Sequence, residues 1–451
     1  MSKARDRDDL TRVGPGTVMG EFMRQYWIPA VLSAELPIDG DPMRLLLLGE
    51  KLIAFRDSAG RVGVVDQRCP HRCASLFLGR NEQHGIRCVY HGWKFDTAGN
   101  CVDMPNVPPE QDFKAKVKAK AYRTAERNGL VWVYMGARQE APPPLPAFEV
   151  ALLPGADVTQ LFVQRDCNWL QALEGDIDTA HFGFLHMGSV AAEDLDPEDM
   201  TRYQVTNRAP QYHVADAPWG TTSAAYRPAE PGRTYWRVAN FLFPFWTQVP
   251  SGAFATLVSA RAWVPMDDEH TMFLHLHWKG TTWAMPVAKR DGGVTLRLTM
   301  RLDFLPNDTG WYGRWRLRAN EANDWEIDRG AQRAGKSFTG IAGLHLQDQA
   351  VTESIGGVGD HEFEHLGPSD RMITLTRRRL LLAARAWHAE QTAPPCVDDS
   401  RAYLDARSGF FLSEEGLDWR EAYARQVASA VRPERRQIAL KSTAADVRSP
   451  V

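Results

Sequence analysis

Two short pairs of cysteine and histidine constrain this chain more than any other feature. The first pair is Cys69 and His71, spaced C-x-H, and the second is Cys88 and His91, spaced C-x-x-H. A proline lies inside the first pair and a glycine follows the second. Such residues favour tight turns whose backbone N–H groups can point at an anionic centre. Cysteines that cluster with histidines predict a metal site.

Two kinds of metal centre compete for this pattern. Structural zinc accepts cysteine and histidine, but usually with C-x-x-C or H-x₃₋₅-H spacing. In a Rieske-type [2Fe-2S] cluster, two thiolates hold one iron and two imidazoles hold the other, so each mixed loop gives one ligand to each iron. The spacing favours the cluster, and a zinc-stabilised binding protein remains the alternative. Cys73 is needed by neither scheme and is expected to be a buried free thiol.

Composition narrows the class of protein. The 451 residues suffice for two or three domains, and the net charge of −3 gives no reason to expect nucleic acid or an anionic membrane as partner. Six cysteines do not make a disulfide scaffold. The start, MSKARDRDDLTR, lacks the apolar core of a signal peptide, and no apolar run approaches the ~20 residues that span a bilayer. We therefore expect a cytoplasmic protein.

The order of strand-like and helix-like segments predicts an α+β chain. Residues 1–40 are expected to be a helical lead-in that packs on the second domain, and residues 41–140 an all-β domain that holds the metal loops in its turns. The proline-rich segment 141–148 predicts a stiff linker, with the second domain over 150–451. Apolar spacing there predicts the strands of an antiparallel sheet over residues 235–246, 253–265, 271–280 and 295–306. It also predicts two helices, over residues 169–184 and 372–387.

A second metal site is indicated within CNWLQALEGDIDTAHFGFLHMG, residues 167–188. Asp178 and His181 are three residues apart and share a helical face, whereas the step of five to His186 needs a local deviation, which Gly183 permits. Two histidines and a carboxylate from elsewhere in the chain would form the facial triad of a non-haem iron(II) oxygenase. A lone helical histidine is more often a packed or surface residue, but imidazoles and acids are costly to bury without partners.

The chain resembles the oxygenase component of Rieske non-haem iron ring-hydroxylating oxygenases, in the phthalate dioxygenase-like branch. The resemblance runs over about residues 11–370, through VGPGTVMGEFMRQYWIP, RVGVVDQRCPHR, CVYHGWKFDTAGNC, CNWLQALEGDIDTAHFGFLH, NDWEIDRGAQR and GIAGLHLQDQAVTESIG. It implies an N-terminal all-β Rieske domain and a C-terminal catalytic domain of helix-grip form. It also implies one [2Fe-2S] cluster and one mononuclear Fe(II) in each subunit.

The resemblance assigns roles that spacing leaves open. It implies that Asp348, and not the nearby Glu353, is the third ligand of the mononuclear iron beside His181 and His186. It also implies that Asp178 hydrogen-bonds His181 and bridges to a cluster histidine, His91, of a neighbouring subunit, as an electron relay.

Two further acidic and basic positions stay less defined. Glu174, one helical turn before Asp178, is expected to tune the same network or to be a solvated or capping residue. His361 stands where many members of the family carry arginine, which concerns local ion pairs and not the ligand set.

Partners follow from the same resemblance. The chain shows no flavin or nicotinamide fingerprint, so a separate NAD(P)H-dependent reductase, with or without a ferredoxin, is expected to supply electrons for O₂. Subunits are expected to assemble head to tail as a homotrimer or hexamer.

An aromatic, carboxylated substrate is implied, and Arg208 and Arg237 are candidates to bind its carboxylate. His275 and His277 alternate on a strand and either line the pocket or form a polar outer face. The alternatives to a ring dioxygenase are an O- or N-dealkylating monooxygenase on the same scaffold and a Rieske electron carrier.

Overall fold

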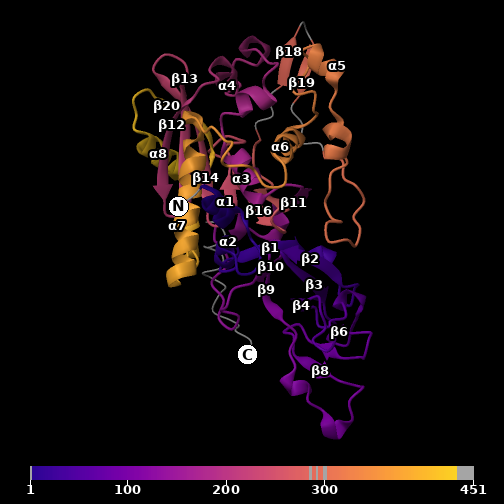
Figure 1. Cartoon of the computed structure of the whole chain (residues 1–451). Coiled ribbons are helices and arrows are strands. Elements are labelled where there is room, and N and C mark those ends of the chain that lie inside the picture. The colour runs from indigo at the N-terminus through magenta and orange to yellow at the C-terminus, as the bar shows by residue number, and fades with distance from the viewer. Residues whose placement is uncertain (1–2, 284–286, 291–292, 298–301, 434–451) are drawn as a thin grey trace.

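The computed structural model describes residues 3–283, 287–290, 293–297 and 302–433 (Figure 1). A smaller β-rich unit, drawn in indigo and purple, lies below a larger unit of strands and helices. The α+β class predicted from the sequence is confirmed. Among the helices in these ranges, none combines the length and apolar character that crossing a membrane requires.

An antiparallel sheet forms the base of the smaller unit. Its strands follow the order β1 (Trp27–Leu32), β10 (Leu130–Tyr134), β9 (Ala121–Arg127), β4 (Val62–Asp66), β3 (Glu50–Arg56) and β2 (Met43–Leu47). The hairpin between β9 and β10 turns through Asn128 and Gly129, both at positive φ (57° and 72°). Two such residues suit the type I′ turn, whose twist matches that of the flanking strands.

A second, smaller sheet carries the two Cys/His loops. It consists of β5 (Arg80–Glu82), β6 (Gly85–Arg87), β7 (Lys94–Phe95) and β8 (Cys101–Asp103). The loops surround a small core of their own, in which Cys69, Cys88 and Trp93 are buried. The end of the unit that bears β6 and β8 points away from the larger unit (Figure 1).

The larger unit is built on a second antiparallel sheet. Its strands follow the order β11 (Val158–Arg165), β17 (Thr271–Trp278), β16 (Ser259–Pro265), β15 (Trp246–Gln248), β14 (Arg233–Leu242), β13 (Gly220–Pro228) and β12 (Gln211–Ala217), and β20 (Gly409–Glu414) also pairs with β14. Helix α3 (Trp169–Ile177) packs on β15 and β16 and against α6 (Leu344–Glu353). The long helix α7 (Arg371–Glu390) contacts β12 and β13.

The larger unit contains further helices and one hairpin. They are α4 (Arg202–Thr206), α5 (Arg329–Arg333), α8 (Trp419–Ser429) and the hairpin of β18 (Val287–Arg290) and β19 (Gly293–Arg297). The strand expected over 295–306 therefore coincides with β19 only at its start, and part of it lies outside the described residues.

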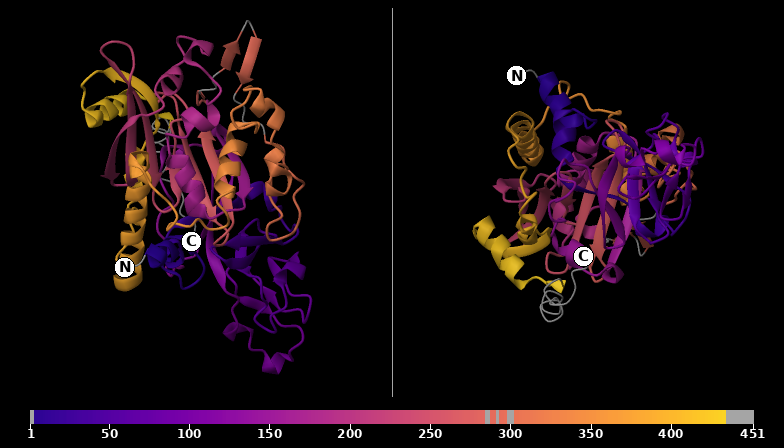
Figure 2. Two further views of the ribbon diagram at one scale, coloured as in Figure 1. Left: turned by 45° about the horizontal axis from the view of Figure 1, so that its top comes forward. Right: turned by 90° about the horizontal axis from the view of Figure 1, so that it is seen from below.

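The first forty residues contact both units. Helices α1 (Lys3–Thr11) and α2 (Val18–Met23) pack against α7, as Figure 2 shows for the indigo and orange helices. The chain then enters β1, which pairs with β10 in the smaller unit.

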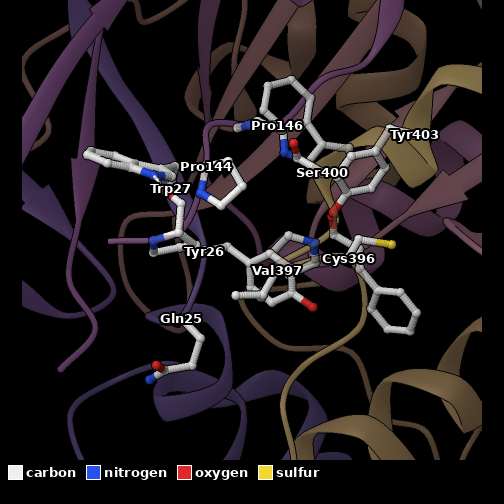
Figure 3. Close-up of a pocket in the computed structure, with 13 residues that line it drawn as sticks. Gln25, Tyr26, Trp27, Pro144, Pro146, Cys396, Val397, Ser400 and Tyr403 are labelled. Carbon is white, nitrogen blue, oxygen red and sulfur yellow. Dashed lines mark hydrogen bonds between the residues drawn. The ribbon is translucent and has the colours of Figure 1, made fainter. Parts of the chain in front are cut away.

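The proline-rich segment is packed at the junction of the units (Figure 3). The Trp27 indole donates to the carbonyl oxygen of Pro143 at 2.6 Å, and the Tyr26 hydroxyl donates to that of Pro395 at 2.7 Å. The hollow between them measures about 20 Å³, which holds about one water molecule. This hollow is therefore a packing gap at the junction of the units, and it is too small for a substrate.

Candidate metal centres

The two Cys/His loops share one backbone frame. In the first loop the Cys73 N–H donates to the Cys69 carbonyl at 2.9 Å, and in the second the Gly92 N–H donates to the Cys88 carbonyl at 3.0 Å. Cys73 and Gly92 occupy the same place in the frame, and both have positive φ (61° and 77°). Cys73 is exposed there, so its expected burial is wrong. It is the turn residue of the first loop, in a backbone conformation that glycine adopts more easily.

The frame brings the four candidate cluster ligands together. Cys69 and Cys88 are buried, and the rings of His71 and His91 lie 4.4 Å apart between centroids. Burial raises the pKa of the Cys69 thiol to about 12, so its thiolate needs a nearby cation. Among the described residues, no group accepts or donates a hydrogen bond at the buried Nδ1 of His91. Two sulfurs and two imidazoles in one place fit a Rieske cluster.

The second group of candidate ligands forms where α3 ends. The helix expected through residue 184 stops at Ile177, and a π-helical turn follows over Phe182–His186. In that turn the Met187 N–H donates to the carbonyl of Phe182, five residues back, at 3.2 Å. A π turn adds one residue to the helical repeat. It therefore brings His181 and His186, which are five apart, to the same side.

Asp348 on α6 completes this group. Its Oδ1 lies 3.1 Å from Nε2 of His186 and 3.5 Å from Nε2 of His181. One ligand atom from each of the three residues lies within 4.8 Å of the others. Two imidazoles and a carboxylate on one side are the donor set of a non-haem iron(II) site with open positions.

Neighbouring side chains set the orientation of both histidines. Nδ1 of His186 lies 2.7 Å from Oε1 of Gln347, an acceptor, so Nδ1 carries the proton and Nε2 is left free to bind a metal. Nδ1 of His181 faces Oδ2 of Asp178 at 3.7 Å, an ion-pair distance. Gln347 was not predicted from the sequence, where nothing distinguishes it from other glutamines.

The group is electrostatically coupled. Burial alone would raise the pKa of Asp348, but the facing imidazoles of His186 and His181 lower it well below its usual range. Burial opposes the charged form of His181, but the carboxylates of Asp178 and Asp348 outweigh it and raise the pKa of that imidazole. A metal cation bound among these groups would stabilise the carboxylates in place of a protonated imidazole.

Two acids that stayed open in the sequence lie outside the metal group. Glu353 accepts from the Asp166 N–H at 3.0 Å and from the Trp325 indole at 2.8 Å. Glu174 is buried, and both of its oxygens accept from the Arg377 guanidinium at 2.6 Å. The solvated or capping role considered for Glu174 is therefore wrong, because it is half of a buried ion pair.

A cavity of about 660 Å³ opens over the histidines and Asp348. Apolar side chains make up much of its wall, including Leu161, Phe182, Leu185, Val249, Trp263 and Phe273. Of the two candidate arginines, Arg237 lines this cavity, whereas Arg208 donates to the carbonyls of Met187 and Val190. Within the described residues, Arg237 has no acidic partner.

His275 and His277 line the same cavity, so their assignment to a polar outer face is wrong. Burial, with the nearby Arg261 cation, lowers the pKa of His275 well below its usual value and keeps it neutral. His361 also lines the cavity, and burial beside Arg377 lowers its pKa to about 4.

Comparison with known proteins covers nearly the whole chain. The Rieske [2Fe-2S] domain family matches residues 26–122, and the family described as LigXa C-terminal domain like matches residues 133–441. The 3-chlorobenzoate-3,4-dioxygenase oxygenase subunit of Comamonas testosteroni is 49% identical over 96% of this chain and 100% of its own length. The phthalate 4,5-dioxygenase oxygenase subunit of Pseudomonas putida is 34% identical over 93% of this chain and 94% of its own.

Among solved structures, dicamba monooxygenase bound to dicamba superposes with a TM-score of 0.54 at 16% identity, over 82% of this chain and 100% of that one. At this identity the likeness concerns the fold alone. The sequence relatives are decisive, because identity of 49% extends over nearly all of both chains. This chain therefore belongs to the Rieske non-haem iron ring-hydroxylating oxygenases, as an oxygenase component with a [2Fe-2S] cluster and a mononuclear iron.

Proposed function

We propose that the chain hydroxylates the ring of an aromatic carboxylate, with His181, His186 and Asp348 as ligands of the mononuclear iron. The observation that carries this proposal is the placement of these three side chains beneath an apolar cavity that also contains Arg237. Cys69, His71, Cys88 and His91 hold the cluster. When bound, the iron supplies the activation of O₂, which is chemistry that no side chain can perform.

The residues of the chain hold the metal, orient its ligands and exclude water from the substrate. Asp348, His181 and His186 all approach from one side, which leaves the other side open to the cavity. Gln347 and Asp178 keep the ligand nitrogens deprotonated toward the metal. The apolar wall buries an aromatic ring and keeps bulk water away from it.

Arg237 is the group that selects a carboxylate. It lies on β14 with its guanidinium 4.9 Å from the Phe182 ring centroid, beside the turn that bears both histidine ligands. A guanidinium binds a carboxylate through two parallel hydrogen bonds. The names of the two relatives, which specify chlorobenzoate and phthalate, support an acid of this class.

The test compares an acid with its amide. Wild-type enzyme is expected to hydroxylate 3-chlorobenzoate with a much lower KM than 3-chlorobenzamide. Arg237→Gln should raise the KM for the acid about 10- to 150-fold, the worth of a hydrogen bond to a charged group, and leave the amide unchanged. An unchanged preference for the acid would refute the role of Arg237.

The same assay with ¹⁸O₂ identifies the reaction. Two labelled oxygens on the ring indicate dioxygenation, whereas one labelled oxygen with loss of an alkyl group indicates the dealkylating monooxygenase.

A separate measurement tests the two metal sites. Iron and acid-labile sulfide are measured on protein prepared without oxygen. Three irons and two sulfides per chain are expected, and zinc without sulfide would refute both metal assignments.

Electrons are proposed to pass between subunits, from the cluster of one copy through Asp178 of the next, in a head-to-tail homotrimer or hexamer. Figure 1 supports this, because the tip of the Rieske domain points away from the catalytic domain of its own chain. Large apolar side chains are exposed beside both centres, Val89 and Tyr90 at the cluster and Phe184 and Ile355 at the mononuclear site. Such patches are typical of surfaces that are buried on association.

A further inference from the structure

The two histidines of the cluster contact different aromatic side chains. The His91 ring lies 3.9 Å from the exposed ring of Tyr90. The His71 ring, 4.4 Å from that of His91 between centroids, stacks on Trp93 at 4.3 Å between centroids and 10° between planes. The edge of Trp93 in turn meets the ring of Phe113, at 5.7 Å and 78°.

Phe113 brings this aromatic series to the surface. Trp93 is buried, whereas Phe113 is 43% exposed. A single buried indole thus separates an exposed ring from a cluster ligand. Because the rate of electron transfer falls steeply with distance, a redox partner seated on Phe113 would have a short route to His71.

Lysines follow the exposed ring along the chain. The segment that follows Phe113 places a lysine at every second position, Lys114, Lys116, Lys118 and Lys120, while Ala119 between them is buried. Asp112 pairs with Lys114 and Glu50 pairs with Lys120. In the part of the chain that the structure describes, Lys116 and Lys118 have no acidic partner, and both are exposed.

We propose that Phe113, Lys116 and Lys118 form the docking surface for the electron donor, an acidic iron–sulfur protein or domain. This rests on the proposed function, in which the cluster must be reduced again in every turnover. Uncompensated lysines attract an acidic partner from a distance, and the apolar ring that precedes them in the chain gives it a contact from which water is excluded. In the transfer the donor loses one electron and the oxidised cluster gains one, and no bond forms or breaks.

These two contacts assign one route to each transfer. The His91 side, with Tyr90, serves transfer to the neighbouring subunit, and the His71 side, with Trp93, receives electrons.

The experiment uses the full-length enzyme with its cluster oxidised and a reduced plant-type [2Fe-2S] ferredoxin as donor. Such ferredoxins lie at lower potential than Rieske clusters, so the transfer runs downhill. Bleaching of the cluster is followed by anaerobic stopped flow at low and high salt. Lys116→Glu/Lys118→Glu is expected to lower the second-order rate constant at least about tenfold at low salt, and the difference should vanish at high salt.

Two controls separate this effect from others. Arg420→Glu/Lys336→Glu inverts two exposed charges of the catalytic domain, so it changes the net charge equally and should leave the rate near that of the wild type. Reduction by dithionite should be equal in all variants with a full cluster spectrum. Phe113→Ala should slow transfer at saturating ferredoxin without changing the salt dependence, and Phe113→Tyr should restore it.

Several results would overturn the proposal. One is an unchanged rate with ferredoxin in the double lysine variant. Another is a double lysine variant that ferredoxin reduces at the normal rate but that has a different oligomeric size. This result would assign the surface to contacts between copies of this chain. Failure of the proposed function is seen separately, because chemically reduced enzyme would then yield no hydroxylated product in a single turnover.

Discussion

Gln347→Ala is expected to weaken iron binding at the mononuclear site without any change of ligand. The variant removes the acceptor that lies 2.7 Å from Nδ1 of His186. Without it the imidazole can carry its proton on Nε2, the atom that faces Asp348, and this proton competes with the metal. The imidazole is also buried, so an unpaired Nδ1–H costs about 1–3 kcal/mol.

The size of the effect follows from two independent estimates. Loss of an outer hydrogen-bond partner typically lowers metal affinity about 10- to 100-fold. This corresponds to about 1.4–2.8 kcal/mol, which agrees with the cost of the unpaired donor. The assay measures metal affinity by anaerobic titration with Fe(II) or Co(II). It uses protein that retains its cluster but has no iron in the mononuclear site.

Two variants provide controls. Gln347→Glu keeps an acceptor toward His186 but loses the amide that donates to the Ile341 carbonyl at 2.8 Å, so it should bind the metal more tightly than Gln347→Ala. Gln349→Ala truncates a second buried glutamine of α6, whose amide donates to Glu353 at 2.7 Å, and should leave the affinity unchanged. If Gln347→Ala bound the metal within twofold of the wild type, or if Gln349→Ala weakened it equally, the orienting role of Gln347 would be refuted.

Three further predictions concern the relay, the cluster and pH. Asp178→Asn should retain iron but slow oxidation of the cluster by the mononuclear site at least about tenfold in single turnover; a normal rate would contradict the relay. Cys88→Ser should lose the visible absorption of the cluster, and retained colour would overturn that assignment. Asp267 is partly buried, which opposes its charge, but hydrogen bonds from His270 and Tyr312 lower its pKa to about 2. An unfolded aspartate has a pKa of about 3.9, so this carboxylate stabilises the fold above pH 4 and the benefit is lost as pH falls toward 2. Asp267→Asn should therefore unfold more readily than the wild type at pH 6, with the gap closing below pH 4; a gap of constant size would be evidence against it.

Sequence could predict those features of the site that depend on local spacing. The mixed Cys/His loops and the Asp178, His181 and His186 series are contiguous, so their chemistry is visible in the sequence. The π turn was visible only as an irregular step of five residues. Residue preference did not reveal it, because the turn is fixed by contacts with distant segments.

Features that depend on tertiary packing escaped prediction. Arg208 and Arg237 look alike in the sequence, but only Arg237 lies on a strand face that lines the cavity. His275 follows the alternation of a surface strand, yet that face of β17 is covered and forms part of the cavity wall. Cys73 was expected to be buried because cysteines usually are. It instead occupies a turn at positive φ and is exposed to solvent.

The position of the third proposed ligand explains why the mononuclear site depends on the whole fold. Asp348 approaches the histidines only because α6 packs closely on α3. At Gly175 a Cβ atom would lie 2.9 Å from Cγ2 of Thr352, so a larger residue there would push the helices apart. Thr352 itself is held, since its hydroxyl donates to the carbonyl of Asp348 at 2.8 Å and accepts from Arg165 at 3.0 Å. The glycine of α3 thus sets the separation between the histidines and the carboxylate, and iron affinity reports on helix packing as well as on the ligands.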